Sequence, residues 1–239
     1  MNRHLHIYDS PEECASAVAQ IILKKTIEKK EQGHPLNIAV SGGSTPKLLF
    51  NILATEFISD LPWEYLRLFW VDERCVAPDN AESNYGMTNT HLLQKAPIPT
   101  ENIFRMKGEN DPEKEAKYYA KILQKELPQK NNFPIFDLIL LGMGDDGHTA
   151  SIFPDNMELL TADASVAVAV HPQSGQKRIT LTGKVLNNAG QSIFLITGAS
   201  KADVLSAIAQ KTLDAKKYPA SYIVAADYYI DKQAAEKLS

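Results

Sequence analysis

The chain has 239 residues, 44% of them hydrophobic and 23% charged, which is the composition of a globular protein with its own core. Its 25 basic and 29 acidic residues give a net charge of −4 and are mixed along the chain, which argues against a nucleic-acid-binding surface. No apolar run approaches the roughly 20 residues of a membrane span, and the N-terminus lacks the pattern of a secretory signal. We therefore expect a cytoplasmic protein with neither a membrane nor a nucleic-acid partner.

Strand-like and helix-like runs alternate along the whole chain. A short strand is predicted at 4–8 and a long helix at 10–33, with Ser10 as its N-cap and Gly33 at its end. Further strands are predicted at 36–40, 66–71, 137–142, 165–170, 178–182, 192–197 and 221–226. Further helices are predicted at 46–53, 111–127, 183–190 and 200–211, and from Asp231 onward.

Most of these strands are apolar on both faces and are separated by helices. This pattern indicates a mostly parallel sheet that helices cover on both sides. We predict an α/β fold, a single doubly wound, Rossmann-like domain spanning residues 1–239. Ligands of such sheets bind beyond the carboxyl ends of the strands. The chemistry is therefore expected in the loops that follow residues 40, 71, 142, 182 and 197.

The stretch "SGGSTP" follows the predicted strand at 36–40 and leads into a helix. We expect Thr45 to be the N-cap of that helix and Pro46 its first residue. Glycines let the backbone approach a ligand, and hydroxyls beside the free amides of a helix N-terminus favour an anion. The loop is neither a Walker loop nor a dinucleotide fingerprint, so a phosphorylated small molecule is favoured over a nucleotide. A capped turn without a ligand explains this loop equally well. The residues concerned are Ser41, Gly42, Gly43, Ser44 and Thr45.

A second glycine-rich loop, in "DLILLGMGDDGHTASIFP" (137–154), ends in a histidine. Gly144 and Gly147 interleave with acidic residues, and His148 follows at the carboxyl end of a strand. A histidine in that place suits general acid–base catalysis, and Asp146, two residues away, is placed to orient its ring. The alternative is that Asp145 and Asp146 cap the next helix while His148 makes only local hydrogen bonds.

Charged residues also stand near the ends of other strands. Asp72 and Arg74 end the strand in "FWVDER", Arg178 begins "RITLT", and Lys201 follows "LITGAS". Each cation taken alone is more often an exposed surface residue. Cys14 and Cys75 fit neither a disulfide framework nor a metal site, and no histidine pair has metal-ligand spacing. We expect no bound metal.

Taken together, these motifs resemble those of the 6-phosphogluconolactonases, a group related to the glucosamine-6-phosphate deaminases. The resemblance runs from about residue 37 to 225. The motifs occur in the same order as in that group: "VSGGSTP", "WVDER" followed by "SNYGM", "LGMGDDGHTASIFP", "RITLT" and "TGASKADVL". Asp145 and Ile152 are small departures from its usual pattern.

The resemblance implies hydrolysis of 6-phospho-D-glucono-1,5-lactone to 6-phosphogluconate, without metal or organic cofactor. The loop 41–45, Arg178 and Lys201 would hold the phosphate of this sugar-phosphate lactone. His148 would be the acid and base, with Asp146 and Arg74 beside it. Arg74 is suited either to stabilising an oxyanion or to binding phosphate. Asp72, Gly144 and Gly147 would line the pocket of a monomer or weak homo-oligomer.

Two other functions compete with this one. A deaminase–isomerase must move a proton between two carbons, and in deaminases a glutamate stands five residues after the histidine. Here that position is Phe153, which cannot relay a proton. A non-catalytic sugar-phosphate sensor usually carries a DNA-binding segment, and the chain before residue 36 has room only for a strand and a helix.

Overall fold

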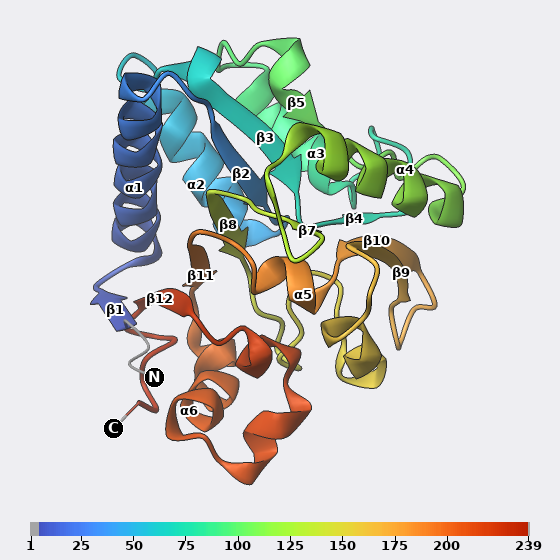
Figure 1. Cartoon of the computed structure of the whole chain (residues 1–239). Coiled ribbons are helices and arrows are strands. Elements are labelled where there is room, and N and C mark those ends of the chain that lie inside the picture. The colour runs from blue at the N-terminus through green and yellow to red at the C-terminus, as the bar shows by residue number, and fades with distance from the viewer. Residues whose placement is uncertain (1–4, 239) are drawn as a thin grey trace.

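The computed structural model describes residues 5–238, and a seven-stranded sheet runs through its centre (Figure 1). Every neighbouring pair of these strands is parallel. The order across the sheet is β1 (Leu5–Tyr8), β12 (Ala226–Asp231), β11 (Ser192–Ile196), β8 (Leu138–Leu141), β2 (Leu36–Val40), β3 (Leu66–Trp70) and β5 (Ile103–Phe104). The predicted parallel sheet is confirmed.

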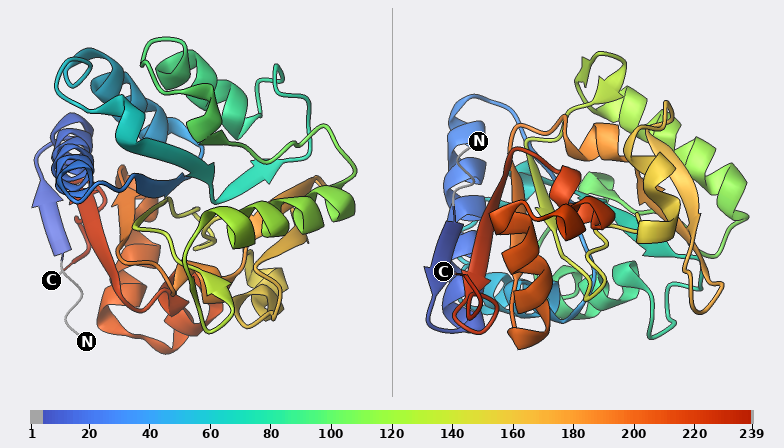
Figure 2. Two further views of the ribbon diagram at one scale, coloured as in Figure 1. Left: turned by 45° about the horizontal axis from the view of Figure 1, so that its top comes forward. Right: turned by 90° about the horizontal axis from the view of Figure 1, so that it is seen from below.

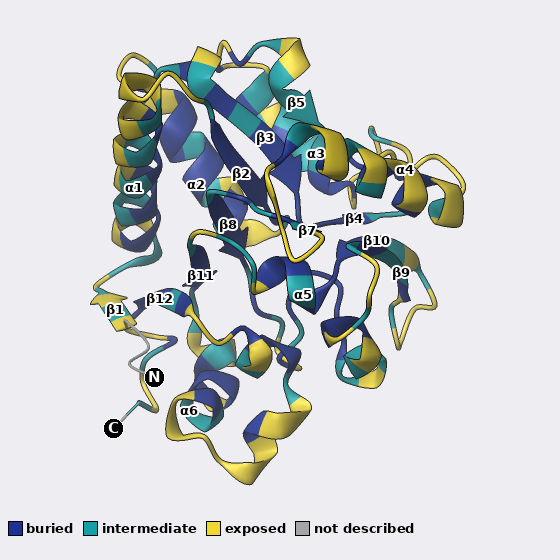
Figure 3. Cartoon of the chain, in the orientation of Figure 1, coloured by how far each residue is buried: buried dark blue, intermediate teal, exposed yellow. Residues whose placement is uncertain are grey.

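Helices cover both faces of this sheet, as Figure 2 shows from two sides. Because side chains alternate along a strand, Ile38 packs into a core with α1 (Pro11–Glu31) and α2 (Ser44–Thr55), whereas Ala39 packs into the core on the opposite face. The second core also takes side chains from α4 (Pro112–Glu126), α5 (Gly183–Leu186) and α6 (Ala202–Gln210). The central strands β2, β3 and β8 are accordingly almost wholly buried (Figure 3).

The order of the strands reverses between β2 and β8. From β2 the chain moves outward to β3 and β5, and later returns to place β8 on the other side of β2. At such a switch point the loops after the two strands diverge and leave a crevice at the carboxyl edge of the sheet. The loops concerned are the glycine loop at 41–43 and the histidine loop at 142–153, so the fold brings the two candidate motifs together.

Two predicted strands belong elsewhere. The strands expected at 165–170 and 178–182 are β9 (Val166–Val170) and β10 (Lys177–Leu181), which form a separate antiparallel sheet with β4 (Asp72–Arg74). The loop after residue 182 therefore does not join the carboxyl edge of the parallel sheet. Other short elements are α3 (Asn84–Thr88), β6 (Gln129–Lys130) and β7 (Phe133–Pro134), besides several 3₁₀ or π turns.

The C-terminal prediction is wrong. A 3₁₀ turn at Pro219–Tyr222 takes the first two residues of the predicted strand, and the strand itself, β12, begins only at Ala226. Between Asp231 and Leu238, the last described residue, the chain forms turns and no helix; the buried Asp231 carboxylate accepts the backbone N–H groups of Gly198 (3.0 Å) and Ala234 (2.8 Å) and so ties the first turn to the loop after β11.

At the other end of the chain, helix α1 is as predicted. Ser10 Oγ caps it by accepting from Glu13 N at 3.1 Å, and Gly33, with φ of 73°, follows its end. The first residue of the predicted strand at 4–8, His4, lies outside the described residues.

Candidate active site

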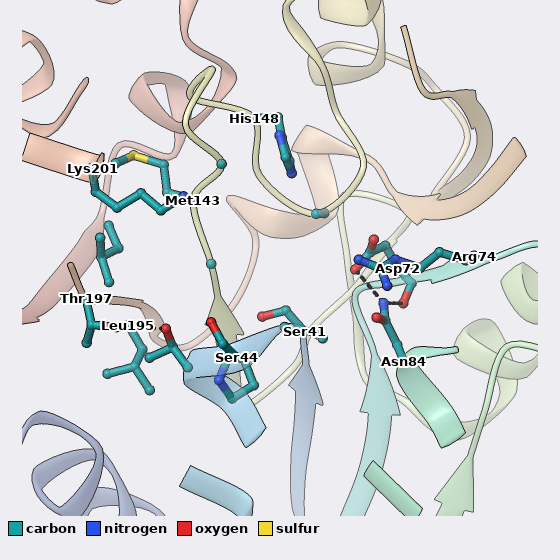
Figure 4. A pocket seen from close by; sticks show the side chains of 18 of the residues that line it. Ser41, Ser44, Asp72, Arg74, Asn84, Met143, His148, Leu195, Thr197 and Lys201 are labelled. Atoms are coloured by element: carbon teal, nitrogen blue, oxygen red, sulfur yellow. Dashed lines mark hydrogen bonds between the residues drawn. The ribbon is translucent and has the colours of Figure 1, made fainter. Parts of the chain in front are cut away.

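A pocket of about 220 Å³ opens at the carboxyl edge of the sheet, between the glycine loop and the histidine loop. Figure 4 shows Lys201 and Thr197 on one side of it and Asp72, Arg74 and Asn84 on the other. His148 lies above the pocket in that view, and Ser41 and Ser44 lie below. Of the predicted site residues only Asp146 and Gly147 do not line it. Those that do are Ser41, Gly42, Gly43, Ser44, Thr45, Asp72, Arg74, Gly144, His148, Arg178 and Lys201.

The glycine loop differs in detail from its prediction. Helix α2 begins at Ser44 rather than Pro46, and its N-cap is Gly43, whose φ of 115° suits a glycine. Thr45 is therefore not the cap, and its Oγ1 instead lies 2.9 Å from that of Thr197. The first amides of a helix have no intrahelical acceptor, and their dipoles favour an anion. The 12-residue helix α2 thus presents its N-terminus to the pocket.

His148 and Asp146 form a pair at the pocket mouth. Nδ1 of His148 lies 2.6 Å from Oδ1 of Asp146, which also accepts the backbone N–H of His148 at 3.1 Å. Partial burial raises the pKa of Asp146, but the hydrogen bonds and charge of His148 outweigh this effect and lower that pKa to about 2. Because the carboxylate is ionised at neutral pH, it fixes the proton of the neutral ring on Nδ1. The remaining ring nitrogen, Nε2, is then free to accept a proton.

Two glycines allow this pair to form. A Cβ atom on Gly144 would lie 2.1 Å from Nδ1 of His148 and 2.6 Å from Oδ1 of Asp146, so the ring and the carboxylate occupy the space of a side chain. Gly147 has φ of 78°, and a Cβ there would come within 2.4 Å of the Tyr218 ring. Gly144 is therefore required by the packing of His148 against Asp146, and Gly147 by its positive φ and by the Tyr218 ring.

Two arginines lie beside each other on one wall. Arg74 on β4 pairs with Arg178 on β10 in the antiparallel register, and both line the pocket. Burial and the neighbouring Arg74 charge lower the pKa of Arg178. The Nε atoms of both side chains are buried without a hydrogen-bond partner among the described residues. Like charges in register repel each other, so this wall is suited to an anion that would satisfy both.

The third cation, Lys201, comes from the first turns after β11. Its Nζ forms a short ion pair with Asp145, which also accepts a hydrogen bond from Ser200 Oγ at 3.0 Å. These contacts, with that to Lys201 the largest, lower the pKa of Asp145. Asp145 therefore neither caps a helix nor touches His148. It holds the lysine whose side chain faces the pocket.

Asn84, which was not among the predicted site residues, supports the wall opposite Lys201. Its Nδ2 donates to the carbonyl oxygen of Asp72 (2.9 Å) and to Oδ1 of the same residue (3.3 Å). The buried Asp72 accepts a further hydrogen bond from Ser151 Oγ at 2.7 Å. The sequence pointed to Asn84 only through the "SNYGM" motif. It does not show that the loop between "VDER" and this motif brings the two together.

Comparison with known proteins places this geometry in a family. A family model for glucosamine-6-phosphate isomerases and 6-phosphogluconolactonase matches residues 9–230. The chain belongs to this family. The 6-phosphogluconolactonase of Treponema pallidum is 42% identical over 204 residues, covering 85% of this chain and 83% of its own. That of Haemophilus influenzae is 40% identical and covers 91% and 94%. The solved 6-phosphogluconolactonase of Trypanosoma brucei has a TM-score of 0.88 at 30% identity, covering 100% of this chain and 99% of that one.

Members of the glucosamine-6-phosphate isomerase/6-phosphogluconolactonase family divide between two chemistries, and Phe153 bears on which applies here. Its ring is buried, with its centroid 4.9 Å from that of His148. A phenyl ring at this place packs against the histidine and carries no proton.

Within residues 5–238, no group of three or more His, Cys, Asp or Glu side chains is arranged to hold a metal ion, and no helix is long and apolar enough to cross a membrane.

Proposed function

We propose that this chain hydrolyses 6-phospho-D-glucono-1,5-lactone to 6-phospho-D-gluconate, the second step of the oxidative pentose phosphate pathway. The observation that carries the proposal is the His148–Asp146 pair at the mouth of a pocket that also holds the N-terminus of α2. A base and an anion site within one pocket suit a substrate that carries a phosphate a few bonds away from an ester carbonyl.

His148 is the general base in this proposal. Its Nε2 takes a proton from a water molecule, whose oxygen attacks C1 of the lactone and forms a tetrahedral oxyanion. When the C1–O5 bond breaks, the protonated ring returns its proton to O5, giving the carboxylic acid and the free hydroxyl. Asp146 keeps the ring in the correct tautomer and stabilises its charged form. General base catalysis of this kind contributes roughly 10²–10⁴-fold.

The opposite end of the substrate is held as an anion. The loop 41–45, with the first amides of α2, receives the phosphate, and Lys201 and Arg178 neutralise it. Arg74, in register with Arg178, stabilises the oxyanion or shares the phosphate. Anchoring the remote phosphate places C1 beside the water on His148 and lowers the entropic part of the barrier.

A deaminase on the same fold is not favoured, because Phe153 stands where a proton relay is needed. We further propose that the protein works in the cytoplasm as a monomer or weak homo-oligomer. It needs no metal, organic cofactor or nucleic acid. It folds as one domain.

A coupled assay at neutral pH tests the function. Glucose-6-phosphate dehydrogenase supplies fresh lactone, and 6-phosphogluconate dehydrogenase reports the product against the spontaneous rate. We expect acceleration by the wild type, and His148→Ala should lose 10²–10⁴-fold in kcat with KM nearly unchanged. If neither protein exceeds the blank, the pocket binds sugar phosphates for another purpose, and ammonia release from glucosamine 6-phosphate becomes the next test.

A further inference from the structure

A buried carboxylate that the proposed chemistry does not use lies directly behind the arginine wall. Glu73 is 2% exposed and stands between Asp72 and Arg74 on β4. Its Oε1 accepts the backbone N–H groups of Asn84 (2.7 Å) and Arg74 (2.8 Å). Its Oε2 accepts the N–H of Tyr85 (2.8 Å) and the hydroxyl of Ser83 (3.2 Å). Four donors therefore converge on one side chain.

These contacts close a loop. Residues 75–83 leave β4 and return to α3, and Glu73 binds the first two amides of that helix, next to its N-cap Ser83. Ser83 Oγ accepts from the third, that of Gly86, at 3.0 Å. The start of α3 is thereby held against the end of β4.

The closed loop carries Arg74 and Asn84, two residues of the pocket side that faces Lys201 (Figure 4). Nη1 of Arg74 donates to the carbonyl oxygen of Glu82 at 2.6 Å, so the place of the guanidinium depends on where the loop returns. Asn84 supports Asp72, and its Oδ1 fills the space where a Cβ of Gly42 would lie, 1.8 Å away. A shift of the loop would consequently move both Arg74 and Asn84, which packs against the glycine loop.

The surroundings of Glu73 indicate a purpose other than ion pairing. Within residues 5–238 it has no cationic partner at salt-bridge distance, and burial raises its pKa although the three backbone amides oppose that rise. Burying a carboxylate is costly unless donors surround it. Here every donor belongs to the segments that bear Arg74 and Asn84.

We propose that Glu73 is a positioning residue for the lactonase reaction, acting through the loop that fixes the guanidinium of Arg74. The proposal rests on the hydrolytic function argued above. Glu73 touches no reacting atom. It determines where Arg74 meets the substrate.

Glu73→Gln tests this role with little change of shape. One amide oxygen still accepts, but an NH₂ group now faces donors such as Tyr85 N–H, so the loop must shift. We expect kcat/KM to fall about 10–100-fold in the wild-type background and less than threefold in an Arg74→Ala background. Such non-additivity marks two residues that act together, whereas general destabilisation would lower both backgrounds by the same factor.

The matched control is Asp137→Asn. Asp137 also accepts a backbone amide, that of Asn37 at 2.8 Å, and pairs with Lys29 at 2.6 Å, but it precedes β8 and so lies at the opposite edge of the sheet. This variant should lose stability and keep kcat/KM. Should Glu73→Gln fail to fold, Ser83→Ala removes one donor from the same carboxylate. It should lower kcat/KM several-fold, again only when Arg74 is present.

The outcomes separate the two proposals. An inactive wild type counts against the hydrolytic function. If the wild type is active and Glu73→Gln keeps the same kcat/KM, only the positioning role is overturned. The same holds if Glu73→Gln lowers kcat/KM by the same factor with and without Arg74.

Discussion

At the scale of single residues, the site depends on how each charged side chain is held by its neighbour. Asp146→Asn tests the most direct case. The amide can still accept from the ring but no longer stabilises its charged form, so kcat should fall about 10–100-fold while KM changes little. The loss is expected to be smaller than for a fully buried triad, because the Asp146 side chain is 45% exposed.

The pH dependence of the wild type provides a check on this assignment. The pKa of Asp146 is lowered from 3.8 to about 2, so its contribution to stability is complete above pH 4 and is lost as the pH falls through about 2. Between pH 5 and 9 its charge is constant. If kcat/KM falls on the acid side of that range, the titration belongs to a group other than Asp146. If this fall disappeared in Asp146→Asn while kcat stayed the same, the role given to Asp146 would be contradicted.

Asp145 is expected to hinder its partner Lys201, whereas Asp146 supports its partner His148. Asp145 forms an ion pair with Lys201, to which we assign the substrate phosphate, and so adds a negative charge near the proposed phosphate site. Asp145→Asn should therefore lower KM about two- to fivefold and leave kcat unchanged, a modest effect because the Asp145 side chain is 70% exposed. Steady-state kinetics with Asp163→Asn, an exposed aspartate paired with Lys184 away from the pocket, supply the control. A higher KM in Asp145→Asn would mean that Asp145 orients Lys201 rather than competing for it.

The sequence was informative about these residues to different degrees. His148, its glycines and Asp146 are adjacent in the chain, so local pattern was enough to bring them together. Arg178 and Arg74 are far apart in the chain, and their register on β4 and β10 is a product of tertiary pairing. Asn84 and Glu73 were missed for the same reason, because their partners are separated from them by a loop.

At the scale of elements, the two glycine-rich loops differ in what their glycines do. Gly43 supplies a left-handed φ at the N-cap of α2, whereas Gly144 provides space for the side chain of His148, the proposed base. The sequence predicted both loops but placed the start of α2 two residues late. Proline at the third helical position is as harmless as at the first, since its missing N–H has no intrahelical acceptor in either place.

Gly144→Ala tests the role of space. The new methyl group would meet Nδ1 of His148 at 2.1 Å, so the ring must leave Asp146 or the loop must move. We expect kcat to fall at least tenfold, with a change in Tm of only a few degrees because the clash falls on the exposed part of the loop, beside Asp145 and Asp146. The measurement is kcat beside the melting temperature. Full activity would show that the ring has room to relocate and that its present contact with Asp146 is dispensable.

At the scale of the whole molecule, the alternation of apolar strands and helices predicted the parallel sheet and its covering on both faces. It did not predict the strand order, which places the loops after β2 and β8 at the switch point. Nor did it separate β9 and β10 from the main sheet, because an apolar strand buried in either sheet has the same composition. The last strand was predicted too early in the chain, because "SYIVAADYYID" is apolar over more residues than one strand uses.

The charge of the whole molecule leads to a final prediction. The chain has a net charge of −4, yet Arg74, Arg178 and Lys201 gather at one pocket. A dianionic substrate is repelled by the surface as a whole and attracted by this pocket. Raising ionic strength shortens the Debye length from about 30 Å at 0.01 M to about 8 Å at 0.15 M, which screens the longer-range terms first.

We therefore expect KM to rise several-fold between low and high salt, with kcat unaffected, because the local attraction exceeds the diffuse repulsion. Lys201→Ala and Arg178→Ala should each raise KM and flatten its salt dependence. Kinetics over a series of chloride concentrations, with osmolarity held constant by a neutral solute, measure both effects. A KM that fell with salt would show that the overall negative charge governs encounter. A KM insensitive to salt and to both substitutions would mean that the phosphate binds elsewhere.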